Sequence, residues 1–355
     1  MKKNILNELG KRIVFFDGGM GTLLQERGLE AGELPENWNL KHPDIIRELH
    51  RDYLNAGADI ILANTFGANE LKFPDNLEEI VTKGVQNAKK AVEETGKDGY
   101  VALDVGPTGK LLKPLGDLPF ETAVSLYKEV VSIGAAAGAD LVLIETMSDS
   151  YELKAAVLAA KEAGINPETG ARLPIFATVI YDEKGKLLTG GNVESTVALL
   201  EGLGVDVLGV NCGLGPEQMK GIVKDILEVS STPILVNPNA GLPRSENGKT
   251  VFDVDPSEFA ENMKIFAEEG AWLMGGCCGT TPAHIKALVE ACKDAMPKPL
   301  TDKNLTLVSS YSHAVELGKM PMLIGERINP TGKSKFKQAL RDRNMEYILE
   351  MGVKQ

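Results

Sequence analysis

The chain has 355 residues, of which 43% are hydrophobic and 25% are charged, and its formal net charge is −12 at pH 7. These proportions are typical of a soluble globular protein that can bury a sizeable core, as one large domain or two ordinary ones. The negative charge argues against nucleic acid and against an anionic membrane surface as the main partner, because both are polyanions.

The amino-terminal stretch, MKKNILNELGKRIVFF, has basic residues but no continuous apolar core and no small-residue cleavage site, so we expect no signal peptide. No uncharged apolar run reaches the about 18 residues that a transmembrane helix needs. Four cysteines in this length are too few for a disulfide framework, and without export their thiols should stay reduced. We therefore expect a cytoplasmic enzyme.

A pattern of ten residues recurs along the chain, in AGADIILANT (56–65), AGADLVLIET (137–146), LGVDVLGVNC (203–212) and EGAWLMGGCC (269–278). Each copy has glycine in second place, then an apolar run, then polar or sulfur-bearing residues in the last two places. The glycine suits the position just after a helix, and the apolar run is typical of a strand buried on both faces.

Four more apolar runs alternate with these copies: IVFFDGG (13–19), YVALDVG (100–106), PIFATVI (174–180) and PILVNPN (233–239). The segments between the runs look helical and amphipathic, so the strands should be parallel with right-handed crossovers. Eight such units predict a (β/α)8 TIM barrel, whose usual length is about 250 residues. A doubly wound open sheet is the alternative, although DGGMGT (17–22) is not the G-x-G-x-x-G loop that often follows its first strand.

The barrel interpretation places the active site at the carboxyl ends of the strands. Polar and sulfur-bearing residues gather there although the strands are apolar: Asp17, Asn64, Thr65, Asp104, Glu145, Thr146, Asn211, Cys212, Asn237, Asn239, Cys277 and Cys278. A core without a function would have little need for this set.

Three cysteines should meet at this rim, because Cys212 follows the sixth strand and the adjacent pair Cys277 and Cys278 follows the eighth. Strands six and eight of a barrel are second neighbours, so their ends can converge. Three thiolates suit a zinc ion whose fourth position stays open for a substrate, and flanking glycines allow adjacent cysteines to bind one ion. Asn239, between these strands, could fill the open position without substrate.

Other interpretations of the cysteines remain. A disulfide between the adjacent pair would be strained, and any single cysteine could belong to the core, as we expect for Cys292 in KALVEACKDA. A closed structural zinc site would need a fourth cysteine or a histidine. His284 lies on a helix whose start is explained by Thr281 as N-cap and Pro282 as first residue, without a metal.

Three thiolates around zinc favour one kind of chemistry. The three negative charges offset the positive charge of the ion, so the ion is a poor activator of water. The site can still hold a fourth thiol as thiolate near neutral pH. This points to alkyl transfer to a thiol rather than hydrolysis.

Four motifs then resemble the homocysteine S-methyltransferase family: DGGMGT (17–22), NTFGAN (64–69), VNC (210–212) and GGCCGTTPAHI (275–285). The resemblance covers about residues 5–297 and implies a zinc-dependent barrel that methylates homocysteine to methionine. It also implies that Cys212, Cys277 and Cys278 bind zinc, and that homocysteine sulfur is the fourth ligand.

Substrate contacts are implied by the same resemblance. Asp17 and Glu145 are the implied acceptors for the substrate ammonium group. Backbone N–H groups around Gly18 and Gly19, with Thr65, are the expected contacts of the substrate carboxylate, since glycine allows a close approach.

The tail PMLIGERINPTGKSKFKQAL (321–340) resembles the opening of the methyltetrahydrofolate-binding barrel of cobalamin-dependent methionine synthases. The expected organisation is a homocysteine-binding barrel (1–297), a linker (298–320) and a truncated start of the pterin-binding domain (321–355). This predicts an N-terminal piece of a larger enzyme.

The methyl donor would then be methylcobalamin, carried by a cobalamin-binding domain that docks at the barrel mouth and not bound by this chain. Two alternatives stay open. One is a stand-alone homocysteine methyltransferase that uses S-methylmethionine or betaine. The other is a zinc- or thiol-binding module without catalysis, for which Asp17 and Glu145 would be unnecessary.

Overall fold

The structure is a computed structural model, and it describes residues 4–246, 249–325 and 328–355. The chain forms two compact units: Met1–Asn304 with Val308–Val315, and Leu305–Leu307 with Glu316–Gln355. The first unit contains a barrel of parallel strands, and the second contains two helices. Most of the segment expected to be a linker therefore packs with the barrel.

Eight parallel strands form the barrel in the order β1-β10-β7-β6-β5-β4-β3-β2, and a bridge between Phe16 and Ile60 joins its two ends. This confirms the predicted (β/α)8 fold, and the open-sheet alternative is wrong. Each predicted apolar run contains one strand: β1 (Val14–Phe15), β2 (Ile60–Leu62), β3 (Tyr100–Val105), β4 (Leu141–Met147), β5 (Ile175–Val179), β6 (Val207–Asn211), β7 (Ile234–Asn237) and β10 (Leu273–Met274).

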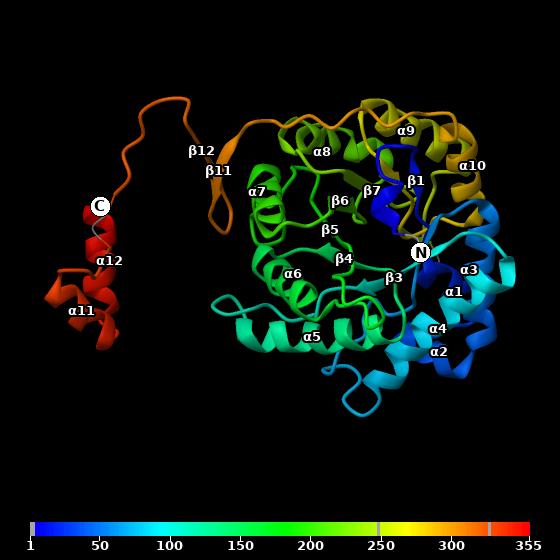
Figure 1. Ribbon diagram of the computed structural model, residues 1–355, viewed down its shortest axis with the longest axis horizontal. Coiled ribbons are helices and arrows are strands. Elements are labelled where there is room, and N and C mark those ends of the chain that lie inside the picture. The colour runs from blue at the N-terminus through cyan, green and yellow to red at the C-terminus, as the bar shows by residue number, and fades with distance from the viewer. Residues whose placement is uncertain (1–3, 247–248, 326–327) are drawn as a thin grey trace. The chain divides into compact units, whose positions relative to one another are not determined.

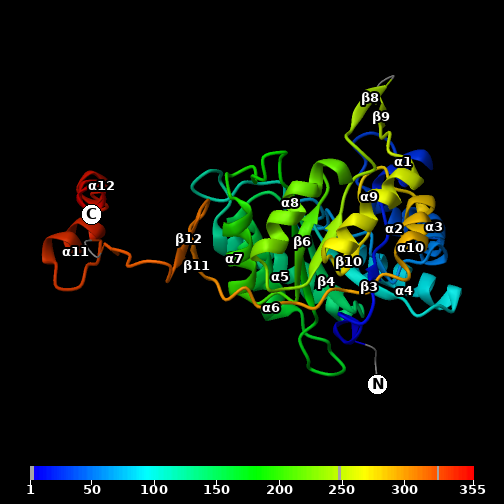
Figure 2. The ribbon, with the colours of Figure 1, turned by 90° about the horizontal axis from the view of Figure 1, so that it is seen from above.

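Helices surround these strands, as Figure 1 shows. The main ones are α1 (Met20–Glu26), α3 (Pro43–Ala56), α4 (Leu77–Thr95), α5 (Phe120–Ala136), α6 (Ser150–Ala163), α7 (Val193–Leu203), α8 (Pro216–Val229), α9 (Pro256–Glu269) and α10 (Pro282–Cys292). Short helices η1 (Ile5–Asn7), η2 (Pro35–Asn37) and α2 (Trp38–Lys41) complete this part. A hairpin of β8 (Arg244–Glu246) and β9 (Lys249–Val251) projects from one end in Figure 2.

The strands separate two apolar cores. Side chains inside the barrel, among them Phe16, Phe176 and Leu235, form the inner core. The larger outer core fills the space between strands and helices, and it includes Phe15 and Cys292. Neighbours such as Phe15 and Phe16 point to opposite sides because side chains alternate along a strand. The interior is therefore filled, and polar groups are displaced to the barrel ends.

Three of the four copies of the ten-residue pattern have aspartate in fourth place, and these aspartates lie at the amino ends of the strands. Each of the three accepts a backbone N–H of the neighbouring strand at 2.7–2.9 Å and forms an ion pair with a nearby cation. The pairs are Asp59 with Arg12, Asp140 with Lys89, and Asp206 with Arg172. The hydrogen bonds and ion pairs of these carboxylates stabilise the barrel at the end away from the cysteines.

The remaining chain contains a hairpin of β11 (Thr306–Ser309) and β12 (Ala314–Leu317), then α11 (Ser334–Arg341) and α12 (Met345–Lys354). Helix α11 begins within the tail motif (321–340). No strand is assigned to residues 321–325, and Glu326 and Arg327 of the motif lie outside the described residues. Within the described ranges, no helix is both long and apolar enough to cross a membrane.

Candidate active site

The three rim cysteines come together in the structure. Strand β7 lies between β6 and β10, and its end fixes both neighbours: the Cys212 N–H donates to the Asn237 carbonyl (3.0 Å) and the Cys277 N–H to the Pro238 carbonyl (2.8 Å). The Sγ atoms of Cys212, Cys277 and Cys278 all lie within 4.8 Å of one another. One metal ion can therefore contact all three.

Glycines allow the adjacent cysteines to turn inward together. Gly279 has φ +80°, and a Cβ on it would lie 2.3 Å from the ring of Phe252. A Cβ on Gly275 would lie 2.5 Å from the Cβ of Phe16, so the chain before the cysteines also approaches β1 closely. Side chains at these two positions would push the cysteine turn away from the rim.

The chemistry of the donor set suits a soft metal. Hydrogen bonds from the thiols of Cys212 and Cys277 lower the pKa of Cys278 to about 4. The pKa of Cys277 lies well above its usual value, because its thiol is hydrogen-bonded to both other sulfurs. One thiolate is thus already favoured, and a cation would favour the others. Asn239 lies near the cysteines in space, because the N–H of the adjacent Ala240 donates to the Cys278 carbonyl (3.0 Å).

Two other candidates for metal binding have different roles. The His284 ring caps α10, since its Nδ1 accepts the Thr281 N–H (3.2 Å), and its Nε2 donates to the Val254 carbonyl (2.9 Å). Both ring nitrogens are therefore occupied, as the capping interpretation predicts. Cys292 is fully buried in the outer core.

Three buried carboxylates lie at the carboxyl ends of the strands, and two of them, Asp104 and Glu145, line the same cavity as the cysteines. Asp17, Asp104 and Glu145 follow or end β1, β3 and β4, and each is less than a tenth exposed. Oδ2 of Asp17 accepts the Leu62 N–H (2.8 Å), whereas its Oδ1 and Oδ1 of Asp104 have no partner among the described residues. The sequence places Asp104 at a strand end but predicts no role for it.

Burial is the main reason why these acids have raised pKa values. The pKa of Asp17 lies well above its usual value because of burial and the nearby charge of Glu145. The same two causes raise the pKa of Asp104. Burial, with the charge of Cys212, raises the pKa of Glu145 to about 8. Such a set of acids suits a cationic ligand, whose charge would restore their ionised forms.

Asn211 orients Glu145 beside the cysteines. Its Oδ1 accepts the Thr146 N–H and the Thr178 hydroxyl, both at 2.8 Å, and its Nδ2 donates to Thr146 Oγ1 (2.7 Å) and to Glu145 Oε2 (3.4 Å). Thr146 has φ +59°, and the register of β4 with β5 shifts at this point. The Asn–Cys pair in the third repeat is the sequence feature that could have indicated this role.

Some of the groups expected to bind a substrate carboxylate already have hydrogen-bond partners within the protein. Gly18 and Gly19 line the cavity, but the Gly19 N–H donates to Thr280 Oγ1 (3.1 Å). Thr65 is fully buried, and its hydroxyl donates to the Asp104 carbonyl (2.8 Å) and accepts the Asp104 N–H (3.2 Å). Thr65 therefore joins β2 to β3, and its hydroxyl is already engaged.

A cavity of about 400 Å³ connects the cysteines, Asp104, Glu145 and the glycine loop after β1. Its size falls in the range of small-molecule sites. Its lining also includes Glu36 of η2, and Phe66 and Lys72 of the connection from β2 to α4, and the sequence predicted no role for these three residues. The Glu36 carboxylate is buried, and its Oε1 accepts the Gly67 N–H (2.5 Å).

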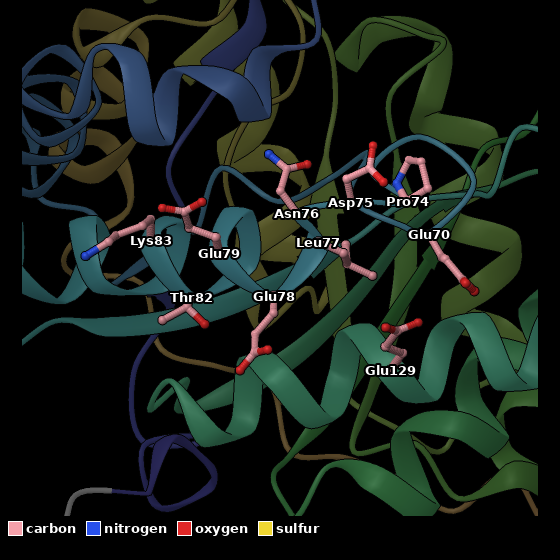
Figure 3. Close-up of a pocket in the computed structure, with 10 residues that line it drawn as sticks. All are labelled: Glu70, Pro74, Asp75, Asn76, Leu77, Glu78, Glu79, Thr82, Lys83 and Glu129. Carbon is pink, nitrogen blue, oxygen red and sulfur yellow. The ribbon is translucent and has the colours of Figure 1, made fainter.

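A second cavity, of about 520 Å³, lies at the start of α4 and is shown in Figure 3. Its wall carries several exposed carboxylates: Glu70, Asp75, Glu78, Glu79 and Glu129. No cysteine or histidine occurs among its described lining residues, so it lacks the soft donors and nucleophiles of the first cavity.

Comparisons with known proteins agree with this geometry. The homocysteine S-methyltransferase family model matches residues 14–292. The methionine synthases of Mycobacterium leprae (strain TN) and Mycobacterium tuberculosis (strain ATCC 25618 / H37Rv) are 34% and 33% identical, over 99% of this chain. The chain spans 31% of the length of either relative.

Solved structures include that of the homocysteine methyltransferase MmuM from Escherichia coli. Its metallated form has a TM-score of 0.65 and 25% identity, covering 80% of this chain and 97% of that one. Its oxidized form has a TM-score of 0.65 and 26% identity, covering 78% and 95%. The family match spans the barrel and includes every cysteine and carboxylate described above. The chain therefore belongs to the homocysteine S-methyltransferase family.

Proposed function

We propose that this chain activates homocysteine at a zinc ion for methylation to methionine, as the homocysteine module of a cobalamin-dependent methionine synthase. The observation that carries the proposal is the pairing of two unlike walls in one cavity. Three sulfur atoms within 4.8 Å of one another face the space that Asp104 and Glu145 also line. Homocysteine has a thiol for the first wall and an ammonium group for the second.

Cys212, Cys277 and Cys278 would hold the zinc, and the bound ion would supply stabilisation of a fourth sulfur as thiolate. Asn239 is the candidate for the fourth position without substrate, because its Oδ1 is buried and has no partner among the described residues. In the reaction, homocysteine sulfur forms a bond to the methyl carbon. The bond between that carbon and its carrier breaks, and the carrier keeps the electron pair.

The carboxylates would orient the substrate for this displacement. Asp17, Asp104 and Glu145 have raised pKa values without a ligand, and the ammonium group of homocysteine would favour their ionised forms. Gly18 and Gly19 would lie near the substrate carboxylate. Binding both the ammonium and the carboxylate group on the α-carbon would direct the side chain to the cysteines, so that the attack starts from a fixed geometry.

The rim offers a surface to a domain that carries the methyl donor. Exposed large apolar side chains occur in the connections that follow β2, β3, β5 and β7: Phe66, Leu71, Leu111, Leu115, Leu188 and Leu242. Apolar surface around a mouth is typical of a protein-binding site. We propose a cobalamin-binding domain as the partner, with methylcobalamin as the donor, and relatives about three times as long support this context.

The organisation of the chain is part of the same proposal. The two relatives align over 99% of the chain, which supports residues 321–355 as the start of a pterin-binding domain after the barrel and linker. All four cysteines are free thiols, which suits a reducing compartment, and we propose the cytoplasm.

Zinc K-edge X-ray absorption during titration with L-homocysteine tests the proposal. We expect three sulfur neighbours before the titration and a fourth at saturation. A non-catalytic zinc module would keep the same spectrum at every homocysteine concentration, and this result would contradict the proposal. L-Homoserine, which has a hydroxyl in place of the thiol, is the control and should add no sulfur.

A further inference from the structure

The segment after α10 returns along the outside of the barrel. At the amino ends of the strands, Trp272 Nε1–H donates to the Lys298 carbonyl (2.8 Å), and the Lys303 N–H donates to Ser231 Oγ (3.0 Å). Residues of α8 and α9 line the groove that holds this part, and Figure 1 shows the segment passing both helices. Residues 298–303 are thus attached to the end of the barrel opposite the cysteines.

A few residues later the chain is attached to the catalytic end. Tyr311 lies in the turn between β11 and β12, and its hydroxyl donates to Asp149 Oδ1 (2.8 Å). Ser150 Oγ donates to the Tyr311 carbonyl (3.0 Å). Asp149 and Ser150 come directly after β4, the strand that carries Glu145. The chain from 298 to 311 therefore spans the barrel from one end to the other.

The Tyr311 turn has neighbours on two sides. Its ring meets the edge of Tyr151 at 6.4 Å between centroids, and Tyr151 stacks on Phe120 at 4.7 Å. On the other side is the loop after β5, where a Cβ added to Gly191 would lie 3.6 Å from the Tyr311 carbonyl oxygen. The turn thus contacts two catalytic-end connections, the one from β4 to α6 and the one from β5 to α7.

The contact of Tyr311 with Asp149 is close in sequence to Glu145 and can affect the position of that residue. Asp149 is the N-cap of α6, and its Oδ1 accepts both the Tyr151 N–H (2.8 Å) and the Tyr311 hydroxyl. It is 1% exposed, and its Oδ2 has no partner among the described residues. Between Glu145 and Asp149 the backbone passes through the register shift of β4 and the positive φ of Thr146. Such a turn keeps its shape only where its flanks are fixed.

We propose that Tyr311 is a positioning residue of the homocysteine site: by fixing Asp149 it holds the β4–α6 turn, and through that turn Glu145. The turn around Tyr311, which belongs to the same compact unit as the barrel, then contributes to the site and is not only part of a connection. This inference rests on the proposed function, because it concerns the carboxylate assigned to the substrate ammonium group.

The test uses the full chain with Tyr311→Phe, which keeps the ring and removes only the hydroxyl. Tyr347→Phe, in α12, is the matched control. We expect faster amide hydrogen exchange at residues 306–317 and 145–151, unchanged zinc content, and about tenfold weaker homocysteine binding by calorimetry, the scale of one lost hydrogen bond to a charged group. Asp149→Asn keeps the oxygen acceptor and should bind nearly as the unmodified chain does.

Asp149→Ala removes the contact with Tyr311 and also the cap of α6, so it should weaken binding at least as much as Tyr311→Phe does. Adding Tyr311→Phe to Asp149→Ala should cause no further loss, because the contact between the two residues is already gone. Faster exchange with unchanged homocysteine affinity would overturn the inference, as would unchanged exchange or a loss of zinc in Tyr311→Phe. If the unmodified chain bound no homocysteine, the proposed function itself would fail, which is a separate outcome.

Discussion

Replacing Asp17 with Asn should make the protein more stable and a weaker binder of homocysteine. The two side chains have the same shape, so the Asn oxygen can keep the hydrogen bond from Leu62 N–H, now 2.8 Å. The amide nitrogen then takes the place of Oδ1, which has no partner among the described residues. The variant therefore changes the charge of the site and leaves its strand contact in place.

The expected magnitudes are set by burial and charge. Burial and the charge of Glu145 raise the pKa of Asp17, so its ionised form opposes folding at neutral pH. Relieving one buried charge should raise the free energy of unfolding of the substrate-free protein by about 1 kcal/mol. Losing a charge-assisted hydrogen bond to the ammonium group costs about 1.5–3 kcal/mol, which weakens binding by about 10- to 150-fold.

Calorimetric titration of the zinc-loaded protein and denaturant unfolding measure the two effects. Asp206→Asn is the matched control, because Asp206 also accepts a strand N–H but forms an ion pair with Arg172 at the opposite end. The control should be less stable and bind homocysteine normally. If Asp17→Asn were destabilised and bound homocysteine with unchanged affinity, Asp17 would be a structural anchor for β2 and the reasoning would be refuted.

Three further outcomes are expected. Replacing Cys212, Cys277 or Cys278 with alanine should abolish stoichiometric zinc in elemental analysis, whereas Cys292→Ala should retain it. If the Cys277 and Cys278 variants both retained zinc, the two adjacent cysteines could not both be ligands. Burial lowers the pKa of His50 to about 3, below its unfolded value of 6.5, so the unfolded state protonates first and stability falls as the pH drops below 6.5. The free energy of unfolding should fall by about 2–3 kcal/mol by pH 4.5. His50→Leu should remove this part of the pH dependence of unfolding, and an unchanged pH dependence would show that the histidine is not neutral in the fold. In an assay of three methyl donors at equal concentration, free methylcobalamin should give slow methionine formation, and betaine and S-methylmethionine should give still slower formation. Rapid turnover with betaine or with S-methylmethionine would favour a stand-alone enzyme.

The barrel and the cysteine site were accessible from sequence because each leaves a local pattern. A strand buried on both faces needs a continuous apolar run, and eight such runs separated by helical segments allow few folds. Cys212, Cys277 and Cys278 lie at the ends of those runs, so strand order alone predicted that they would meet. The same argument indicated Asp17 and Glu145.

Other parts of the site leave no such pattern. Glu36 enters the cavity from the short helix η2, far from any strand end, and only tertiary packing brings it there. Thr65 does lie at a strand end, yet its hydroxyl is engaged by Asp104, which spacing cannot reveal. The contact of Tyr311 with Asp149 joins residues 162 positions apart, and no periodicity connects them.

The two ends of the barrel show how one residue type serves two purposes. At the amino ends, Asp59, Asp140 and Asp206 each have a backbone N–H and a cation as partners, so their charges are satisfied and stabilise the fold. At the carboxyl ends, buried oxygens of Asp17 and Asp104 have no partner among the described residues. Unpartnered buried oxygens cost stability unless a ligand completes them. The carboxyl end is thus distinguished less by its residue types than by buried oxygens without a partner among the described residues, and in the proposed function the substrate supplies those partners.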